Sequence, residues 1–317
     1  MYQSALGAWA RGDLFIAATA LNDAEDDHKG RGRILHYGSD LQPKGVLWLK
    51  DTTHLVGGLK FDPQGVLWAF DSMGFVILNI KRDGTVIRRK EFGARPFSHV
   101  NFADDGSLLL AEHAFGDTIR PEIQSRMKTV MPFMLGTQRF GDGHVFRFSD
   151  DGHLIAKYAT EVHGGMGGFL GVTMSVISTD QKTLVYCTET GPRLMRYDLV
   201  SNKQLPDLQG FSAPYAPGPP PMFFAMEYSP DGLLYVLRGR SIHAVNAHGI
   251  TTREIALEGY GWALMDLSKN GAIAFTSNFI TGEIAKIDLN SGAKLGGINT
   301  GEVRSVAGLV EYQGEGL

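Results

Sequence analysis

Apolar and polar residues alternate along short segments of this chain, and tight polar turns separate the segments. Residues 58–69 read GLKFDPQGVLWA, and residues 224–236 read FAMEYSPDGLLYV. In both segments, two apolar runs flank a turn that contains Asp, Pro and Gly. Apolar residues at every second position are typical of a half-buried strand, and a Gly-containing turn between two such runs predicts a β-hairpin.

The hairpin pattern is repeated along the chain. It recurs around residues 100–110, 178–182 and 268–271, and each hairpin is followed by further strands with the same alternation. Full units of four short strands begin near residues 55, 97, 171, 222 and 262. Repeated units of four antiparallel strands are the signature of a β-propeller, in which each unit forms one blade.

The two ends of the chain predict one further blade. Residues 13–19, 33–37 and 45–50 read as strands that lack an innermost partner, and residues 303–309 resemble an innermost strand. Joining the ends closes the ring and removes exposed sheet edges. We therefore predict an all-β fold, a six-bladed β-propeller closed by N-terminal strands plus a C-terminal innermost strand, with residues 1–317 as a single domain.

Loop lengths distinguish the two faces of the predicted propeller. One face carries short Gly, Asp or Asn turns, whereas the long segments all fall on the other face: residues 20–32, 114–143, 161–170 and 208–222. Functional groups concentrate on loops that a rigid scaffold positions, so the second face is the candidate site. The insertion at about 114–143 has an apolar tip that includes Phe133 and Met134, which predicts a lid. The alternative is that the tip packs on neighbouring loops or on a second subunit.

Charged residues recur at the end of the second strand of different units. Asp71, Glu112, Glu189 and Arg238 occupy this position, which the fold places at the channel mouth. Carboxylates brought together either bind a cation or raise one another's pKa, as acid–base catalysis requires. The alternative is that each carboxylate bonds backbone amides of its own turn.

Histidines lie near the same strand ends. His54, His99 and His113 are expected at this face, and a neutral imidazole can take or give a proton near pH 7. We assign the catalytic role to Glu189, Glu112, Asp71, His99 and His113. We assign substrate binding to Arg238, His54, Phe133, Met134, Phe224 and Trp262.

One unit carries a family resemblance. Residues 178–184 read STDQKTL and residues 188–197 read TETGPRLMRY, which resembles the superfamily of SMP-30 (regucalcin), gluconolactonases and strictosidine synthase-like proteins. The resemblance implies a central site at the top of the channel. In the gluconolactonase branch it implies a divalent metal held by a Glu, two Asn and an Asp. The strictosidine synthase-like branch needs no metal and uses a carboxylate as its acid–base group.

The Asn ligands that the resemblance implies are missing from this chain. The corresponding positions hold no Asn: Gly57, Ser98, Thr173, Phe224 and Ala263. The matching acids remain as Asp71, Glu112 and Glu189, which make up a replacement set of ligands for a divalent cation such as Ca, Mg, Mn or Zn.

Composition limits the classes of partner. The chain has 30 basic and 34 acidic residues, a balance that argues against a nucleic-acid surface. No apolar run reaches the roughly 18 residues of a membrane span, and the single cysteine, Cys187, excludes an intramolecular disulfide framework. The first residues show no basic region followed by an apolar run, so a cytoplasmic location is expected. The expected partner is a small-molecule substrate, without nucleic acid or membrane, and the expected state is a monomer or weak homo-oligomer.

These observations predict an enzyme of the gluconolactonase/SMP-30-like type, acting on a small, partly apolar organic substrate at the top of the channel. Hydrolysis of a lactone or ester by carboxylate and histidine acid–base chemistry is the leading expectation. One alternative is a metal-independent lyase or condensing enzyme of the strictosidine synthase-like type. Another is a non-catalytic binding propeller like those built from NHL repeats.

Overall fold

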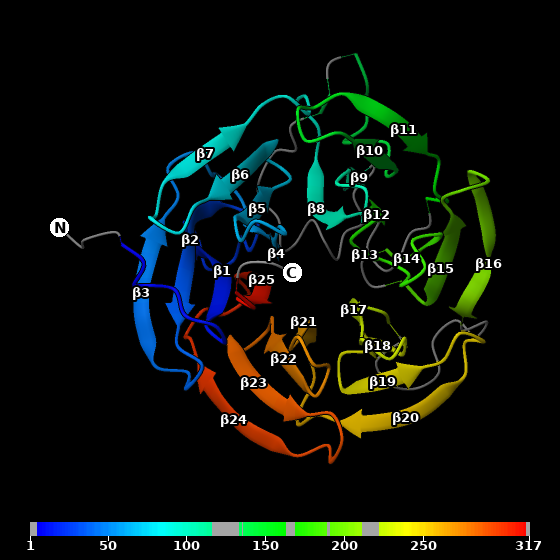
Figure 1. Ribbon diagram of the computed structural model, residues 1–317. Helices are drawn as coiled ribbons and strands as arrows, with labels where there is room; N and C mark the ends of the chain where they lie inside the picture. Colours follow the sequence, from blue (N-terminus) through cyan, green and yellow to red (C-terminus); the bar gives the residue numbers. More distant parts are fainter. Residues whose placement is uncertain are drawn as a thin grey trace.

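The computed structural model describes residues 5–115, 133–134, 136–162, 169–188, 191–210 and 222–314. These residues form strands joined by turns and loops, and Figure 1 shows the sheets arranged around a central axis. Within these ranges, no helix has the length and apolarity that crossing a bilayer requires.

Three sheets are four-stranded antiparallel meanders in which each strand pairs with the next along the chain. The first consists of β13 (Met174–Ile177), β14 (Thr183–Cys187), β15 (Arg193–Asp198) and β16 (Lys203–Gly210). The second consists of β17 (Ala225–Tyr228), β18 (Leu234–Leu237), β19 (Ser241–Val245) and β20 (Thr251–Ala256). The third consists of β21 (Trp262–Leu267), β22 (Ile273–Asn278), β23 (Glu283–Asp288) and β24 (Lys294–Asn299).

A fourth sheet has the same meander and one additional short strand. Its strands are β8 (Phe97–Phe102), β9 (Leu108–Phe115), β10 (Val145–Phe148), β11 (Leu154–Tyr158) and β12 (Phe169–Gly171). β12 lies in a segment for which the sequence predicts a loop. It pairs with the end of β9, where His113 faces Gly171, and so extends the sheet at the predicted channel mouth.

The remaining strands form one curled eight-stranded sheet. In spatial order these are β3 (Pro43–Trp48), β2 (Gly30–Tyr37), β1 (Leu14–Leu21), β25 (Val306–Glu311), β4 (Gly57–Phe61), β5 (Leu67–Asp71), β6 (Val76–Ile80) and β7 (Val86–Arg89). The C-terminal strand β25 pairs with β1 in antiparallel fashion and with β4 in parallel fashion.

The prediction of six separate closed blades is therefore wrong. The structure has four blades in a ring plus the curled eight-stranded sheet. The bridge that joins the two halves of this sheet pairs Ala307 with Gly57. A Cβ at Gly57 would lie 2.3 Å from the Ala307 carbonyl oxygen, and one at Gly308 would lie 2.8 Å from Leu59. The glycines thus let the two innermost strands approach and pair, which counting repeat units does not reveal.

The hairpin turns follow the local sequence signal. In the turn between β4 and β5, Asp62 Oδ1 accepts hydrogen bonds from the backbone N–H groups of Gln64 and Val66 at 3.0 and 2.8 Å. Gly65 in this turn has a φ of 78°, a conformation that glycine adopts without steric cost. Aspartate and glycine at these two positions make the short turn predicted from the sequence.

The apolar core lies between neighbouring sheets. Trp68 and Phe70 of β5 share one cluster with Phe97 of β8 and Phe146 of β10, and each of these side chains is at least 95% buried. Burying such a side chain contributes roughly 2 to 3 kcal/mol. The sheets stack face to face around the ring, and their innermost strands lie nearest the axis (Figure 1).

Candidate functional site

Asp71 ends β5 and is fully buried. Its Oδ2 accepts hydrogen bonds from the backbone N–H groups of Thr53 and His54 at 2.8 and 3.0 Å, and its Oδ1 accepts one from Gly74 at 2.8 Å. The carboxylate therefore ties the loop before β4 to the turn after β5. This arrangement has the form of the backbone-anchoring alternative.

Glu112 on β9 is also fully buried and is bound in a similar way. Its Oε1 lies 2.8 Å from Arg95 Nε, and its Oε2 accepts backbone hydrogen bonds from Asp142 at 2.8 Å and Gly143 at 3.2 Å. Burial raises the pKa of Glu112, and the Arg95 guanidinium opposes this shift. Arg95 also contacts Asp142 Oδ2 at 2.8 Å, so the ion pair fixes the approach of the long insertion to β9.

The third predicted carboxylate, Glu189, lies outside the described residues. Within the described part of the chain, no group of three or more His, Cys, Asp or Glu side chains is placed to hold a metal ion. The proposed cation ligands include Glu189, so the metal site stays a prediction. Most of the predicted lid, residues 116–132 and 135, also lies outside the described residues, while Phe133 is 40% exposed. The carbonyl of Met134 accepts a hydrogen bond from the backbone N–H of Thr137 at 3.1 Å.

Histidines from different segments of the chain lie close to Asp71 and Glu112. His113 follows Glu112 on β9, and its Nδ1 lies 3.2 Å from Ser72 Oγ, the residue after Asp71. Its Nε2 is buried and has no hydrogen-bond partner among the described residues. His54 Nδ1 lies 2.8 Å from Thr53 Oγ1 and 3.7 Å from Asp71 Oδ1.

A further histidine, His28, joins this group. The residue is 8% exposed, and its Nδ1 contacts Asp27 Oδ1 at 2.6 Å. Lys29 forms a β-bridge with His54, which brings the loop of β1–β2 against the loop before β4. We call His28, His54 and His113 the mouth histidines.

Burial keeps the imidazoles of His54 and His113 neutral at neutral pH. Burial lowers the pKa of His113 to about 4, and the positive charge that His28 carries when protonated lowers it further. Burial likewise lowers the pKa of His54, although Asp71 opposes the shift. A neutral imidazole has one nitrogen that accepts and one that donates, so the rings of His54 and His113 each offer an acceptor nitrogen.

His99 lies deeper, on β8, and faces a narrow cavity on the axis. We call this the axial cavity; its volume is ≈ 40 Å³, and its polar lining consists of His99, Asn101, Ser175, Lys60, Glu227 and Asp266. Burial lowers the pKa of His99 to about 3, with smaller contributions from His113 and Lys60.

Sequence reasoning missed most of this lining, although the repeat contains a signal for it. Lys60, Asn101, Glu227 and Asp266 are each the residue before the last in an innermost strand, namely β4, β8, β17 and β21. Aligning the repeats on their turns places these four polar residues at one matched position, where packing alone favours apolar residues.

The remaining predicted substrate contacts belong to the sheet of β17–β20 and its neighbour. The Arg238 guanidinium lies 5.4 Å from the centre of the Phe223 ring, and burial lowers the pKa of Arg238. Phe224, partly exposed, donates its backbone N–H to Leu237 O at 3.0 Å. Trp262 is 2% exposed and donates its indole N–H to Glu258 O at 2.8 Å, so its ring packs within the core.

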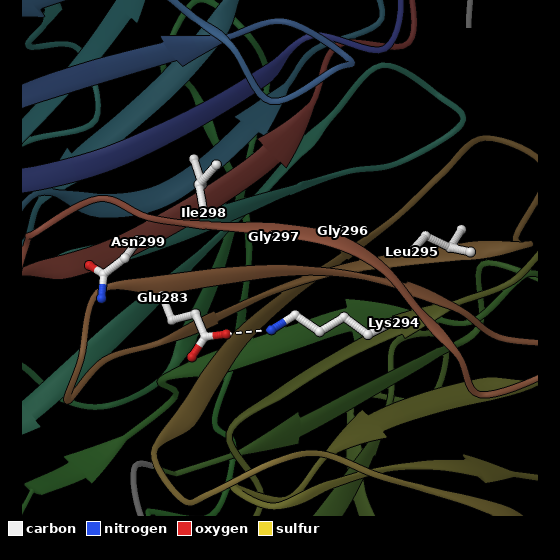
Figure 2. Close-up of a pocket in the computed structure, with 7 residues that line it drawn as sticks. All are labelled: Glu283, Lys294, Leu295, Gly296, Gly297, Ile298 and Asn299. Carbon is white, nitrogen blue, oxygen red and sulfur yellow. Dashed lines mark hydrogen bonds and ion pairs between the residues drawn. The ribbon is translucent and has the colours of Figure 1, made fainter.

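A larger concavity lies on the outer rim. It measures ≈ 440 Å³ and is lined by β24 and by Glu283 of β23. Figure 2 shows Lys294 and Glu283 facing each other across it, with a contact of 2.6 Å. None of the predicted site residues lines it, and its only titratable groups are this exposed pair, so the chemistry of the described residues is concentrated at the mouth and in the axial cavity.

No family model and no curated protein matches the chain. Solved structures do match. A chain in the crystal structure of a nidogen/laminin complex has a TM-score of 0.61 at 11% identity, covering 96% of this chain and 100% of that chain. The virginiamycin B lyase from Staphylococcus aureus has a TM-score of 0.47 at 13% identity, covering 79% of this chain and 71% of that chain.

Both neighbours are β-propeller proteins. At these identities the likeness concerns the fold alone. Together with the ring of sheets, it defines this protein as an all-β propeller, and the SMP-30 superfamily remains a resemblance of sequence motifs.

Proposed function

We propose that the protein is an enzyme that binds a small, partly apolar organic molecule at the channel mouth and moves a proton with a histidine there. The observation that carries the proposal is His113, a buried, neutral imidazole whose Nε2 has no hydrogen-bond partner among the described residues. His54 and His28 lie beside it, on the face that the long loops elaborate. A buried donor or acceptor left without a partner is costly, so a ligand atom or water at Nε2 is favoured.

The leading reaction is hydrolysis of a lactone or ester. For Nε2 of His113 to accept a proton, Nδ1 must carry the hydrogen, and Ser72 Oγ at 3.2 Å is placed to receive it. Nε2 then takes a proton from a water molecule whose oxygen attacks the substrate carbonyl carbon. The same nitrogen returns the proton to the leaving oxygen as the carbon–oxygen bond breaks. Asp71 and Glu112 support this chemistry by holding the loops and not by transferring protons.

Residues beside the strands of the sheet β17–β20 offer contacts for the part of such a substrate that does not react. Arg238 stacks on Phe223, and Arg240 lies 5.6 Å from the centre of the Tyr260 ring, on the turn between β18 and β19. Figure 1 places this sheet across the axis from β5, which ends in Asp71. Aromatic rings and guanidinium planes offer flat apolar contact together with positive charge.

The test is a screen of lactones, aryl esters and amine–aldehyde pairs, with and without a chelator. His113→Gln should lower kcat by about 100-fold or more, because a positioned general base contributes 10²- to 10⁴-fold. The control is His153→Gln, which changes an exposed histidine in the turn between β10 and β11. Wild-type turnover in the His113 variant would remove the residue from the mechanism. Turnover of amine–aldehyde pairs alone would favour the condensing alternative, and loss of turnover on chelation would support the predicted cation.

The pH profile gives a second test of the same base. Because His113 must be neutral to act, activity should be constant at neutral pH and fall only as the pH drops through its pKa of about 4. An ordinary exposed histidine would instead give a fall near pH 6.5. A kcat/KM profile that falls near 6.5 and is unchanged by His113→Gln would contradict the assignment.

A further inference from the structure

The axial cavity brings polar side chains from five innermost strands to one place. Its volume of ≈ 40 Å³ exceeds the 10 to 15 Å³ or so that one water molecule needs, and its polar groups supply the partners that buried water requires. Residues of the innermost strands β4, β8, β13, β17, β21 and β25 line it around the axis. The cavity is therefore suited to hold a few ordered water molecules.

The hydrogen-bond partners of His99 determine which of its ring nitrogens donates and which accepts. Ser98 Oγ lies 3.1 Å from Val172 O and 3.2 Å from Ala111 O, and carbonyl oxygens only accept, so its hydroxyl hydrogen is used there. His99 Nδ1, 2.9 Å from Ser98 Oγ, must then be the donor. Its Nε2 accepts, and the donor is the Ser175 hydroxyl at 2.7 Å.

Ser175 in turn receives a hydrogen bond from Asn101 Nδ2 at 2.9 Å. The second lone pair of Ser175 Oγ is left for a donor from the cavity, because a hydroxyl oxygen accepts two hydrogen bonds. One side of the cavity is thus a neutral, ordered relay that ends in an acceptor for water.

The other side of the cavity carries charge. Lys60 Nζ contacts Glu227 Oε2 at 2.8 Å, which pairs the cation with one carboxylate. Asp266, 6% exposed, accepts one backbone hydrogen bond, from Glu311 N to Oδ2 at 2.8 Å. Burial raises the pKa of Asp266 to about 7; Lys60 opposes the shift, while the carboxylates of Glu227 and Glu311 add to it.

We propose that the axial cavity holds a short chain of water molecules, and that Asp266 exchanges a proton with this chain. In the outward step the O–H bond of the Asp266 carboxyl breaks as an adjacent water oxygen gains the proton. Each water passes one of its own protons onward, and the last proton goes to solvent. Asp266 is left as a carboxylate beside Lys60, and the reverse step restores it.

The proposal goes beyond the proposed function and does not depend on it. The water chain and the Asp266 proton do not require catalysis, so both are measured without substrate. A failure of the hydrolysis screen therefore leaves this experiment informative, and a failure here leaves His113 as the base at the mouth.

The first measurement is a carboxyl ¹³C NMR titration of the full chain. The Asp266 resonance should titrate with a midpoint near pH 7. Lys60→Met removes the neighbouring positive charge and should raise that midpoint by about one pH unit or more. Lys182→Met, which changes an exposed turn lysine, is the matched control and should leave it unchanged. A wild-type midpoint below about 5, the range of ordinary carboxyls, overturns the proposal.

The second measurement is a high-resolution crystal structure at neutral pH, with one crystal pressurised with xenon. Ordered waters should lie within hydrogen-bond distance of Asp266 and of Ser175, and xenon should not enter. The nonpolar part of the lining includes Met174, Met226 and Met265, so a dry cavity would accept xenon. Xenon density without waters overturns the proposal whatever the titration shows.

Discussion

Asp71 and Asp266 are both buried aspartates in strands that approach the axis, yet their surroundings differ. The Asp71 carboxylate receives three backbone N–H groups, from Thr53, His54 and Gly74. The described contacts of Asp266 include one such donor, from Glu311, and its nearest cation already pairs with Glu227. Asp71 closes a loop, whereas Asp266 faces a cavity.

The comparison teaches that burial alone does not make a carboxyl reactive. Backbone N–H groups stabilise the ionised form and tie it to the fold. Where such donors are few, burial favours the protonated form, as the raised pKa of Asp266 indicates. The number of donors, and not the position at a strand end, separates the two roles. This contrast leads to three measurable consequences.

The largest expected effect is at the anchor. Asp71→Ala leaves a cavity at a fully buried position and three amide N–H groups without their acceptor, which should lower the free energy of unfolding by about 3 to 5 kcal/mol. Urea denaturation measures the change. Asp104→Ala removes an exposed turn carboxylate and should change stability by less than about 0.5 kcal/mol. An Asp71 variant as stable as the Asp104 variant would contradict the structural role assigned to Asp71 and, with it, the contrast with Asp266.

A smaller effect with the opposite sign is expected at Asp266. Its pKa is raised by burial from 3.8 to about 7 in the folded protein. As the pH rises through about 4, the unfolded chain ionises while the folded protein keeps its proton, so stability falls until the pH passes about 7. Asp266→Asn cannot ionise and escapes this loss.

Relative to wild type, Asp266→Asn should therefore gain about 3 to 4 kcal/mol between pH 4 and pH 8. Urea denaturation at both pH values measures the gain, and the comparison between pH values cancels any packing cost of the substitution. If the difference in unfolding free energy between variant and wild type is the same at both pH values, the Asp266 carboxyl has no raised pKa and resembles Asp71.

The fold was predictable where the signal is local. Asp62 and Gly65 mark a hairpin turn because their side-chain and backbone preferences act within a few residues. The number of blades was not, because the bridge between Gly57 and Ala307 joins strands from distant parts of the chain. No repeat pattern shows how closely two glycine-containing strands approach.

For the candidate site too, the repeats predicted positions along the strands but not the contacts that decide each residue's role. Repeat alignment located the strand end that carries Asp71, whereas β9 continues past Glu112 and His113 to Phe115, where it pairs with β12. It did not distinguish an anchor from a reactive group, since the amides that bind Asp71 come from a loop before another strand. The buried loop position of His28 depends on the bridge from Lys29 to His54, which has no sequence signature.

The smallest effect on stability is expected on the outer rim, where an exposed ion pair has neither the backbone donors of Asp71 nor the buried cavity of Asp266. Lys294 and Glu283 contact each other at 2.6 Å with side chains 45% and 33% exposed. Exposed ion pairs contribute about 0 to 1 kcal/mol because water and salt screen them. Lys294→Ala should therefore change the free energy of unfolding by less than about 1 kcal/mol and leave any hydrolytic turnover unchanged. Loss of turnover in this variant would move the candidate site from the channel mouth to the rim concavity of Figure 2, because nothing else connects this side chain to the mouth histidines.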